Sequence, residues 1–360
     1  MTTGPSSVRA WTVEAYRPGD EIHILELFRR EFGVERSEAH WRWKFLENPY
    51  GGPFISLAWH GDPRFLVGNQ VLMPVPLNVD GRRVLAGHSL DLVVHRGFRR
   101  QGVFEQTGRH AMETLRQAAG EAVVAFPNAS SYPGFVRSLG WSRILEPTRW
   151  SLRLGLRGKL ERSPALRPFA HSLGALYQGL TGVRLRRALA SARAATARLS
   201  VSHAEQLPGQ TDALWEREAR SAALSLWKDR TYLSWRYERN PDHRFTYHLL
   251  ERDTELVGLA VSVVRQRTSL LCELLVPERD VAAGRRLVLE SCFHDSTRGA
   301  EVIQFLGHDR GWFADVLCDF TRRVAPENVF VGRALSDDVL NRRMADPAQW
   351  TLAYGDGDFV

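Results

Sequence analysis

The chain has 360 residues, of which 44% are hydrophobic and 10% aromatic, with 11 tryptophans and 3 cysteines. This composition excludes a disordered chain and a disulfide-stabilised scaffold, and the length suggests two globular domains. No stretch approaches the roughly 18 uninterrupted apolar residues that a membrane-spanning helix needs, and residues 1–20 lack the basic and apolar segments of a secretory signal. We therefore expect a protein of the reducing cytoplasm.

The formal net charge is +7, and its distribution is uneven. Residues 151–200 hold ten basic side chains against one acidic side chain, so this segment alone carries +9 and the rest of the chain −2. Such a segment indicates a linker helix packed across two domains, or else contact with an anionic surface or polyanion. Because the flanking parts are nearly neutral, we expect no DNA partner, and membrane contact only through this segment.

An internal repeat is visible in four short matches that occur in the same order. They pair residues 43–49 (WKFLENP) with 235–241 (WRYERNP), 66–68 with 256–258, 91–94 with 273–276, and 135–139 with 313–317. The spacing between partners shrinks along the chain, as expected for two copies that differ in loop length. We therefore predict one domain over 1–150, an Arg-rich helical linker over 151–200, and a second, related domain over 201–360.

The first copy shows a clear order of elements. Apolar residues at helical spacing predict a helix over 22–32, and Ser37 opens another that ends before the turn residues 48–52. The remaining elements are predicted as strands 54–59 and 65–75, a hairpin turn at 78–81, strand 84–94, helix 103–119, strand 122–126 and a short helix over 131–139. In the linker, a helix is expected over 183–199. The predicted class is α+β, with a mixed, mostly antiparallel sheet flanked by helices.

The loop 94–104 joins a strand end to a helix start. Glycine there allows a tight turn, and the free N–H groups at the start of the helix, aided by the helix dipole and by Arg99 and Arg100, suit a phosphate group. A solvated basic loop is the alternative for such a motif in isolation. The hydrophobic strand before it and the amphipathic helix after it favour anion binding.

These residues resemble the GNAT superfamily of acyl-CoA-dependent N-acyltransferases, whose [Q/R]-x-x-G-x-[G/A] loop binds the pyrophosphate of coenzyme A. Residues 99–104 fit this loop except that Phe104 replaces Gly or Ala, and residues 136–141 occupy the frame of the family's Y-x-K-L-G-F segment. The repeat and the closing segment 346–356 resemble bacterial members with two tandem domains. The resemblance implies transfer of an acetyl group from acetyl-CoA to an amine of a small molecule, sugar or peptide.

The resemblance also implies roles for individual residues. The strand end would pair with the pantetheine arm, and the Val94 N–H would stabilise the oxyanion. Asn128 would contact the coenzyme, with capping of the next helix as the alternative. The implied coenzyme-binding residues are Leu92, Val93, Val94, Arg99, Arg100, Gln101, Gly102, Val103, Phe104 and Asn128.

His88 stands where other family members place a base, and by strand alternation it shares a face with Leu90, Leu92 and Val94. A histidine is suited to proton abstraction near neutral pH. The alternative is a histidine hydrogen-bonded in or beside the core. Asp91 lies on the opposite face and is expected to be structural.

The family tyrosine that protonates the leaving thiolate is Val136 here. A thiolate, whose conjugate thiol has a pKa of about 8.5, leaves tolerably without full protonation. Tyr132 could supply the hydroxyl instead, or it is a plain turn residue.

The second copy lacks the coenzyme loop, since residues 277–284 place acids where a phosphate would lie. We therefore expect no second coenzyme site. Cys272 and Glu273 could line a cleft, although a buried cysteine usually packs inertly. Because no Cys or His pair shows metal-ligand spacing, no metal is predicted.

Two other functions stay open. Tandem members of this fold include enzymes that move aminoacyl groups from charged tRNA to peptidoglycan precursors, although these generally lack the loop at 99–102. A non-catalytic acyl-CoA-binding or regulatory module is supported by Phe104 and Val136.

Overall fold

The computed structural model describes residues 11–325 and 327–358. The chain forms two compact units, and neither is continuous in sequence. The first takes in the chain up to residue 76, residues 84–145 and residues 329–347, whereas the second takes in 77–83, 146–328 and the chain from 348 on. The predicted division at 150 and 200 therefore differs from the structure, for a reason that the strand order explains.

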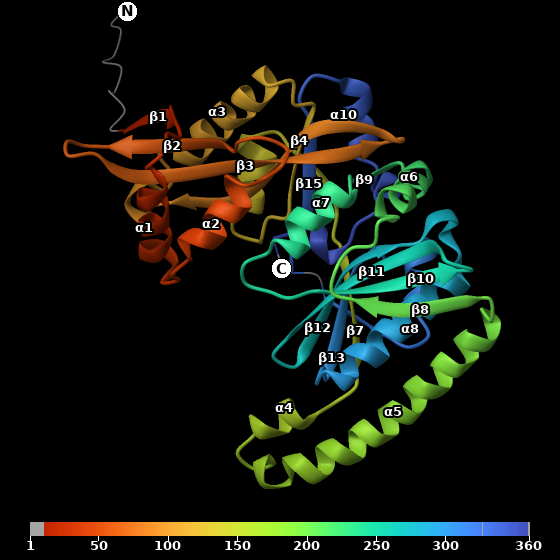
Figure 1. Cartoon of the computed structure of the whole chain (residues 1–360). Coiled ribbons are helices and arrows are strands. Elements are labelled where there is room, and N and C mark those ends of the chain that lie inside the picture. The colour runs from red at the N-terminus through yellow and green to blue at the C-terminus, as the bar shows by residue number, and fades with distance from the viewer. Residues whose placement is uncertain (1–10, 326, 359–360) are drawn as a thin grey trace, which may run out of the picture. The chain divides into compact units, whose positions relative to one another are not determined.

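The first unit follows the predicted order of elements (Figure 1). The predicted helices and strands between residues 22 and 139 are confirmed, with ends that differ by a few residues. The first strand, β1, was not predicted. The elements are β1 (Trp11–Ala15), α1 (Glu21–Phe32), α2 (Glu38–Phe45), β2 (Phe54–His60), β3 (Phe65–Val79), β4 (Arg82–Val94), η1 (Arg96–Phe98), α3 (Val103–Gln117), β5 (Ala122–Ala125), η2 (Gly134–Ser138), β6 (Ser142–Leu145), β15 (Phe330–Ala334) and α10 (Asp338–Met344).

From residue 199 to residue 324, the second unit repeats the order of the first with one added strand, and further elements precede and follow this part. Its elements are β7 (Thr148–Arg153), α4 (Arg157–Glu161), η3 (Arg167–Phe169), α5 (Ala170–Ala195), β8 (Leu199–Ala204), α6 (Thr211–Ser221), β9 (Leu224–Leu226), α7 (Arg230–Leu233), η4 (Ser234–Glu238), β10 (Thr246–Arg252), β11 (Glu255–Arg265), β12 (Thr268–Leu275), η5 (Pro277–Arg279), α8 (Val281–Thr297), β13 (Val302–Gly307), α9 (Gly311–Leu317), β14 (Arg322–Val324) and η7 (Tyr354–Asp356). Between the units, η6 spans Pro347–Gln349. The tip of the β3–β4 hairpin also belongs to this unit, where Leu77 to Val79 pair with β9.

The two sheets have the same strand order. The first runs β1-β2-β3-β4-β5-β15-β6 and the second β14-β7-β13-β12-β11-β10-β8, which is the corresponding order read from the other edge. Strand β15 lies antiparallel between β5 and β6, and β7 lies antiparallel between β13 and β14. Each sheet is thus completed by the strand that follows the other copy in the sequence. This exchange is why β15 leaves the predicted domain 201–360 and why β7 crosses the predicted boundary at 150.

The repeated N-P signature performs the same task in both copies. The Asn48 Oδ1 accepts a hydrogen bond from the Tyr50 N–H at 2.9 Å, and the Asn240 Oδ1 accepts one from the Asp242 N–H at 3.0 Å. In each copy, the asparagine side chain stabilises the turn that leaves the second helix, with proline preventing the helix from continuing. Two mixed sheets flanked by helices confirm the predicted fold class.

The basic segment is part of the second unit and not a connector between domains. Helix α5 packs on α8 through Leu185, Leu189 and Ala192, which join the core of this unit. The predicted helix over 183–199 begins earlier, at Ala170, and forms the long light-green helix of Figure 1. Over the described residues, none of the helices combines the length and the apolar character needed to cross a bilayer.

Candidate functional site

The loop between β4 and α3 leaves the start of the helix open. Gly102 is the residue before α3 and has φ +84°, and Arg100 has φ +62°. A Cβ built at Gly102 would meet no atom within 4 Å in the described structure, and the first turn of α3 has no side-chain cap there. The first N–H groups of α3 lack intrahelical partners, so this terminus can accept an anion.

The same helix is fixed closely to the sheet. A Cβ at Gly68 on β3 would lie 2.4 Å from the Val103 Cγ1, so glycine is required where α3 approaches the strand. Phe104, the departure from the family motif, packs edge-on against Phe135 with ring centroids 5.5 Å apart. A Cβ at Gly134 would lie 2.7 Å from that ring. Gly134 therefore accommodates the larger side chain.

Two loop cations, Arg96 and Arg99, are ion-paired with a buried carboxylate that the sequence did not reveal. The Glu31 side chain on α1 is 2% exposed, and its Oε2 accepts a hydrogen bond from the Arg99 Nη2 at 3.0 Å. The Arg96 Nε and the His95 Nε2 lie 3.6 and 3.9 Å from the Glu31 Oε1. Arg99, expected to face a pyrophosphate, is thus ion-paired, whereas Arg100 is exposed. Local sequence spacing carries no signal for Glu31, because α1 and the loop are far apart in the chain.

Strand β4 continues beyond the end of its parallel partner. Residues 86–89 pair with 122–125 on β5, and residues 90–94 run on past the last of these pairs. Beyond residue 89, the edge of β4 on its β5 side is thereby released from pairing with β5. This part of the strand includes the residues expected to meet the pantetheine arm. This geometry can present backbone hydrogen-bonding groups to an extended ligand.

The alternation of side chains along β4 is interrupted at Asp91, whose φ of +48° lies in the left-handed region. Before it, Gly87 faces α3, because a Cβ there would lie 2.7 Å from the Leu115 Cδ2. After it, Leu92 packs against the cluster that contains Leu115, and Val94 against the cluster that contains Val103. The prediction that His88 shares a face with Leu92 and Val94 is therefore wrong, since regular alternation does not continue through Asp91.

His88 and Asp91 have separate surroundings. The His88 ring is buried, with its centroid 5.8 Å from that of Phe126. The buried Asp91 carboxylate is ion-paired with Arg36 and lies 3.5 Å from the Lys44 Nζ through its Oδ1. These partners fit the structural role expected for Asp91.

The residues after β5 form a capped turn. The Asn128 Oδ1 accepts hydrogen bonds from the Ser130 and Ser131 N–H groups at 3.0 and 3.1 Å. These bonds are those of a capping residue, the alternative to coenzyme contact for Asn128. Tyr132 is half-buried and packs against the Phe135 cluster. Val136 lies on η2 and is half-buried.

In the second copy, a carboxylate occupies the corresponding helix start. Asp280 precedes α8, and its Oδ1 accepts hydrogen bonds from the Ala282 and Ala283 N–H groups at 2.8 and 3.2 Å. This internal anion takes the place that a phosphate would need.

Glu273, at the strand end of the second copy, lies in a buried charged cluster. The Lys228 Nζ lies 2.5 Å from the Glu273 Oε2 and 2.7 Å from the Asp356 Oδ1, and the Tyr237 hydroxyl donates to the Glu273 Oε1 at 2.6 Å. Burial raises the pKa of the neighbouring Cys272 thiol well above its usual range, which makes it unreactive. Cys272 and Glu273 are therefore buried structural residues. For Cys272, this is the inert packing that was the alternative to lining a cleft.

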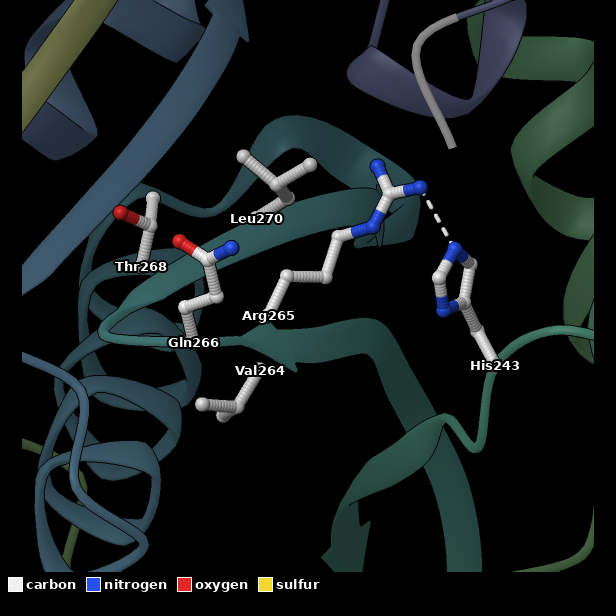
Figure 2. A pocket seen from close by; sticks show the side chains of 6 residues that line it. All are labelled: His243, Val264, Arg265, Gln266, Thr268 and Leu270. Carbon is white, nitrogen blue, oxygen red and sulfur yellow. Dashed lines mark hydrogen bonds between the residues drawn. The ribbon is translucent and has the colours of Figure 1, made fainter. Parts of the chain in front are cut away.

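A surface cavity of about 570 Å³ lies in the second unit at the β11–β12 hairpin (Figure 2). The Arg265 Nη2 is 2.5 Å from the His243 Nε2 across its rim. None of the predicted site residues lines it. The lining residues are His243, Val264, Arg265, Gln266, Thr268 and Leu270.

Residues 12–144 match the family described as acetyltransferase (GNAT) domain. Most of the matched residues lie in the first unit, which is thus similar to this family, and the chain has the GNAT fold. Among curated proteins, none matches this sequence.

Solved structures share this fold over most of the chain. A GCN5-related N-acetyltransferase from Anabaena variabilis is 9% identical with a TM-score of 0.62, covering 91% of this chain and 73% of its own. A tandem GNAT protein from the clavulanic acid biosynthesis pathway is 14% identical with a TM-score of 0.54, covering 91% and 99%. Saccharomyces cerevisiae N-myristoyltransferase with bound myristoyl-CoA is 13% identical with a TM-score of 0.56, covering 92% and 84%. At these identities the likeness is one of fold.

Proposed function

We propose that the protein is an acyl-CoA-dependent N-acyltransferase that transfers the acetyl group of acetyl-CoA to an amine. The observation that carries this proposal is the glycine-led, uncapped start of α3 in a GNAT domain. The contrast with α8, which Asp280 caps, supports a single coenzyme site in the first unit.

The residues at this position fit a coenzyme pyrophosphate. Gly102 leaves space that a Cβ would fill, and the first N–H groups of α3 offer donors. Arg100 is exposed beside them and can add a cation, while the Gln101 Nε2 donates to the Gly97 carbonyl at 2.9 Å and so shapes the loop. The released residues 92–94 of β4 would pair with the pantetheine arm.

When bound, acetyl-CoA supplies an activated acyl carbon. In the proposed transfer, the acceptor nitrogen bonds to that carbon, the carbon–sulfur bond breaks, and one amine proton leaves. The Val94 N–H is the proposed donor to the developing oxyanion, a contribution of about 2.7–4 kcal/mol to the barrier in comparable sites. His88 is the proposed base, and the Tyr132 hydroxyl the proposed proton donor to sulfur.

The acceptor is proposed to be an amine of a small molecule, sugar or peptide, and the compartment the cytoplasm. A second candidate function is a non-catalytic acyl-CoA-binding module. It is favoured by Val136, which has no proton to give at the position of the family's acid.

The test combines binding and turnover. The melting temperature of the full chain is measured with acetyl-CoA and with coenzyme A, and free thiol release is then followed over a panel of amines. Ligand at 100 times its dissociation constant should add about 2.7 kcal/mol of stability. Binding with amine-dependent thiol release supports the transferase, whereas binding without release over the panel supports the non-catalytic module. No shift with either ligand would overturn both.

A further inference from the structure

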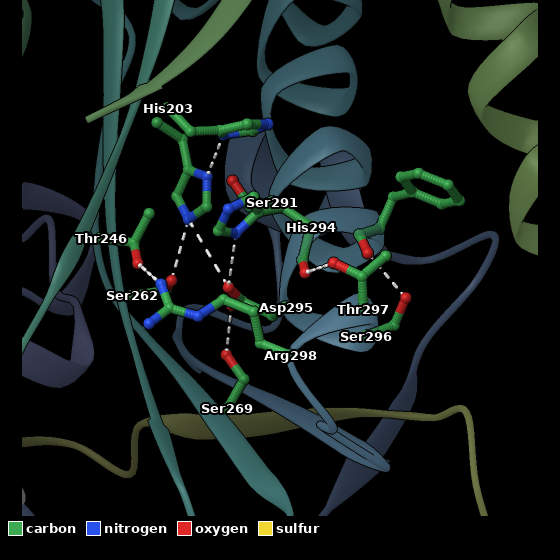
Figure 3. A network of polar contacts seen from close by, with 12 residues as sticks. His203, Thr246, Ser262, Ser269, Ser291, His294, Asp295, Ser296, Thr297 and Arg298 are labelled. Carbon is green, nitrogen blue, oxygen red and sulfur yellow. Dashed lines mark hydrogen bonds and ion pairs between the residues drawn. The ribbon is translucent and has the colours of Figure 1, made fainter. Parts of the chain in front are cut away.

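Three histidines from distant parts of the sequence meet in the second unit. Figure 3 labels two of them, His203 and His294. His203 on β8 and His248 on β10 are direct partners in the antiparallel register, so their side chains lie on the same face of the sheet. His294 comes from the last turns of α8, which packs on these strands. One nitrogen from each ring lies within 4.8 Å of the other two.

The hydrogen bonds around the rings select which nitrogens face one another. The His248 Nε2 lies 2.8 Å from the Ser262 Oγ, and the His294 Nδ1 lies 3.3 Å from the Asp295 Oδ1. The His203 and His248 Nδ1 atoms are 2.8 Å apart. With Nε2 of His248 and Nδ1 of His294 engaged by oxygen atoms, the opposite nitrogen of each ring is the one that can serve a shared ligand. For His248 this nitrogen contacts the His203 Nδ1, and a bound ion would replace that hydrogen bond.

The carboxylate beside the cluster is itself held in place. The Ser269 hydroxyl donates to the Asp295 Oδ2 at 2.6 Å, and the Asp295 Oδ1 lies 4.0 Å from the His248 Nε2. A carboxylate or hydroxyl that accepts the outer N–H of a histidine is the usual support of a metal-binding imidazole, because it fixes the ring and its tautomer.

We propose that His203, His248 and His294 form a binding site for a divalent transition-metal ion of the zinc class. Three imidazoles suit zinc, copper, nickel or cobalt, and two zinc-bound nitrogens in tetrahedral geometry stand about 3.3 Å apart. The separations here need only small side-chain movements to reach that value. His203 is exposed, so solvent can reach the site and supply a fourth ligand.

The ion would tie together elements that only the fold brings close. Strand β8 is the edge of the second sheet, and the site would link it to β10 and α8. Because residues 203, 248 and 294 are far apart in the chain, the site does not exist in the unfolded protein, and binding stabilises the second unit. The inference does not depend on acyl transfer in the first unit.

The earlier expectation of no metal rested on the spacing of residues along the sequence. Cross-strand partners escape such a search, since the register of β8 and β10 places His203 opposite His248. The competing explanation is a network of neutral imidazoles that share protons. Burial lowers the pKa of His248 to about 3, so its ring is neutral at pH 7 under either explanation.

The test uses the full chain, free of any affinity tag and stripped of metal by a chelator. Zn²⁺ is titrated against a chromophoric competitor, the melting temperature is followed, and Co²⁺ is added separately to record its visible absorption. We expect one equivalent of Zn²⁺, a higher melting temperature, and the intense absorption of four-coordinate cobalt.

Four variants separate the site from general histidine binding. His203→Ala and His294→Ala should each weaken Zn²⁺ binding at least about tenfold and remove the cobalt band. His171→Ala, at an exposed histidine of α5 in the same unit, should behave as the wild type. Ser262→Ala keeps all three ligands and should weaken binding by about tenfold. Equal Zn²⁺ affinity in the wild type and His203→Ala, or a wild type that binds no Zn²⁺, would overturn the proposal.

Discussion

Gly102 and Asp280 occupy the same position in the two copies, each directly before the helix that follows the fourth core strand. Gly102 adds no side chain to the helix start, whereas the Asp280 carboxylate accepts hydrogen bonds from two N–H groups of α8. The electrostatic attraction of a helix N-terminus for an anion is thus satisfied internally in one copy and left open in the other. This difference supports the proposal of a single coenzyme site, at the start of α3.

Glu31 should compete with the coenzyme for the loop cations. Its buried carboxylate holds Arg99, so Glu31→Gln should free this side chain and tighten coenzyme A binding by up to about fivefold, the range expected for one partly exposed ion pair. Isothermal titration at two salt concentrations measures the change. Glu113→Gln removes an exposed pair with Arg116 on α3 and serves as the control. Weaker binding in Glu31→Gln would show that the carboxylate orders the loop and does not compete.

His88 and Tyr132 should affect turnover more than coenzyme binding. His88→Ala and Tyr132→Phe are each expected to lower kcat by about 10²–10⁴-fold, the usual contribution of one proton-transfer group. The dissociation constant for acetyl-CoA should stay unchanged. Because His88 is buried, the melting temperature of each variant is compared with that of the wild type. Full turnover in His88→Ala would show that the base assignment is wrong.

Lys228 should be essential to the stability of the second unit. Its removal leaves the Glu273 and Asp356 carboxylates buried without their shared cation. Lys228→Met should cost about 3–5 kcal/mol of unfolding free energy, as expected for a broken buried pair. Denaturant unfolding measures this value, and Lys159→Met at an exposed position of α4 should change it little. A Lys228→Met loss below about 1 kcal/mol would contradict the prediction.

His308 should make the protein less stable in mild acid. Burial lowers the pKa of His308 below its usual value of about 6.5. Below pH 6.5 the unfolded chain therefore binds more protons than the folded chain, and stability falls as the pH decreases, by at most about 1.4 kcal/mol per pH unit for one group. His308→Gln should reduce this slope between pH 6.5 and 5. Burial also lowers the pKa values of His203 and His248, so these two histidines should preserve part of the slope in the His308→Gln variant. An unchanged slope in His308→Gln would contradict the argument.

Much of the first unit could be predicted because its signals are local. The apolar spacing of 22–32 predicted α1, and the Asn-x-Asp-Gly turn predicted the β3–β4 hairpin, where the Asn78 Oδ1 accepts from the Gly81 N–H at 2.8 Å. The repeat was visible because each copy keeps the same asparagine turn. These features depend on residues a few positions apart.

The remainder depended on distant contacts. The exchange of β7 and β15 changes which sheet a strand joins without changing its own pattern. The left-handed backbone at Asp91 interrupts the alternation from which the face of His88 was predicted, and the sequence gives no sign of this interruption. The partnership of Glu31 with Arg99 and the convergence of the three histidines both arise from packing and strand register, which sequence spacing does not encode.

Adding an internal anion at the open start of α3 decides whether this helix terminus binds the coenzyme. Coenzyme A binding is measured by titration calorimetry for the wild type, Gly102→Asp and Gly102→Asn. Both variants carry a side chain of the same size at φ +84°, so they share the steric and backbone effects and differ in charge. We expect tight binding by the wild type, weaker binding by Gly102→Asn, and the weakest by Gly102→Asp, whose carboxylate reproduces the situation of Asp280. Equal binding by all three proteins, or no binding by the wild type, would contradict this expectation.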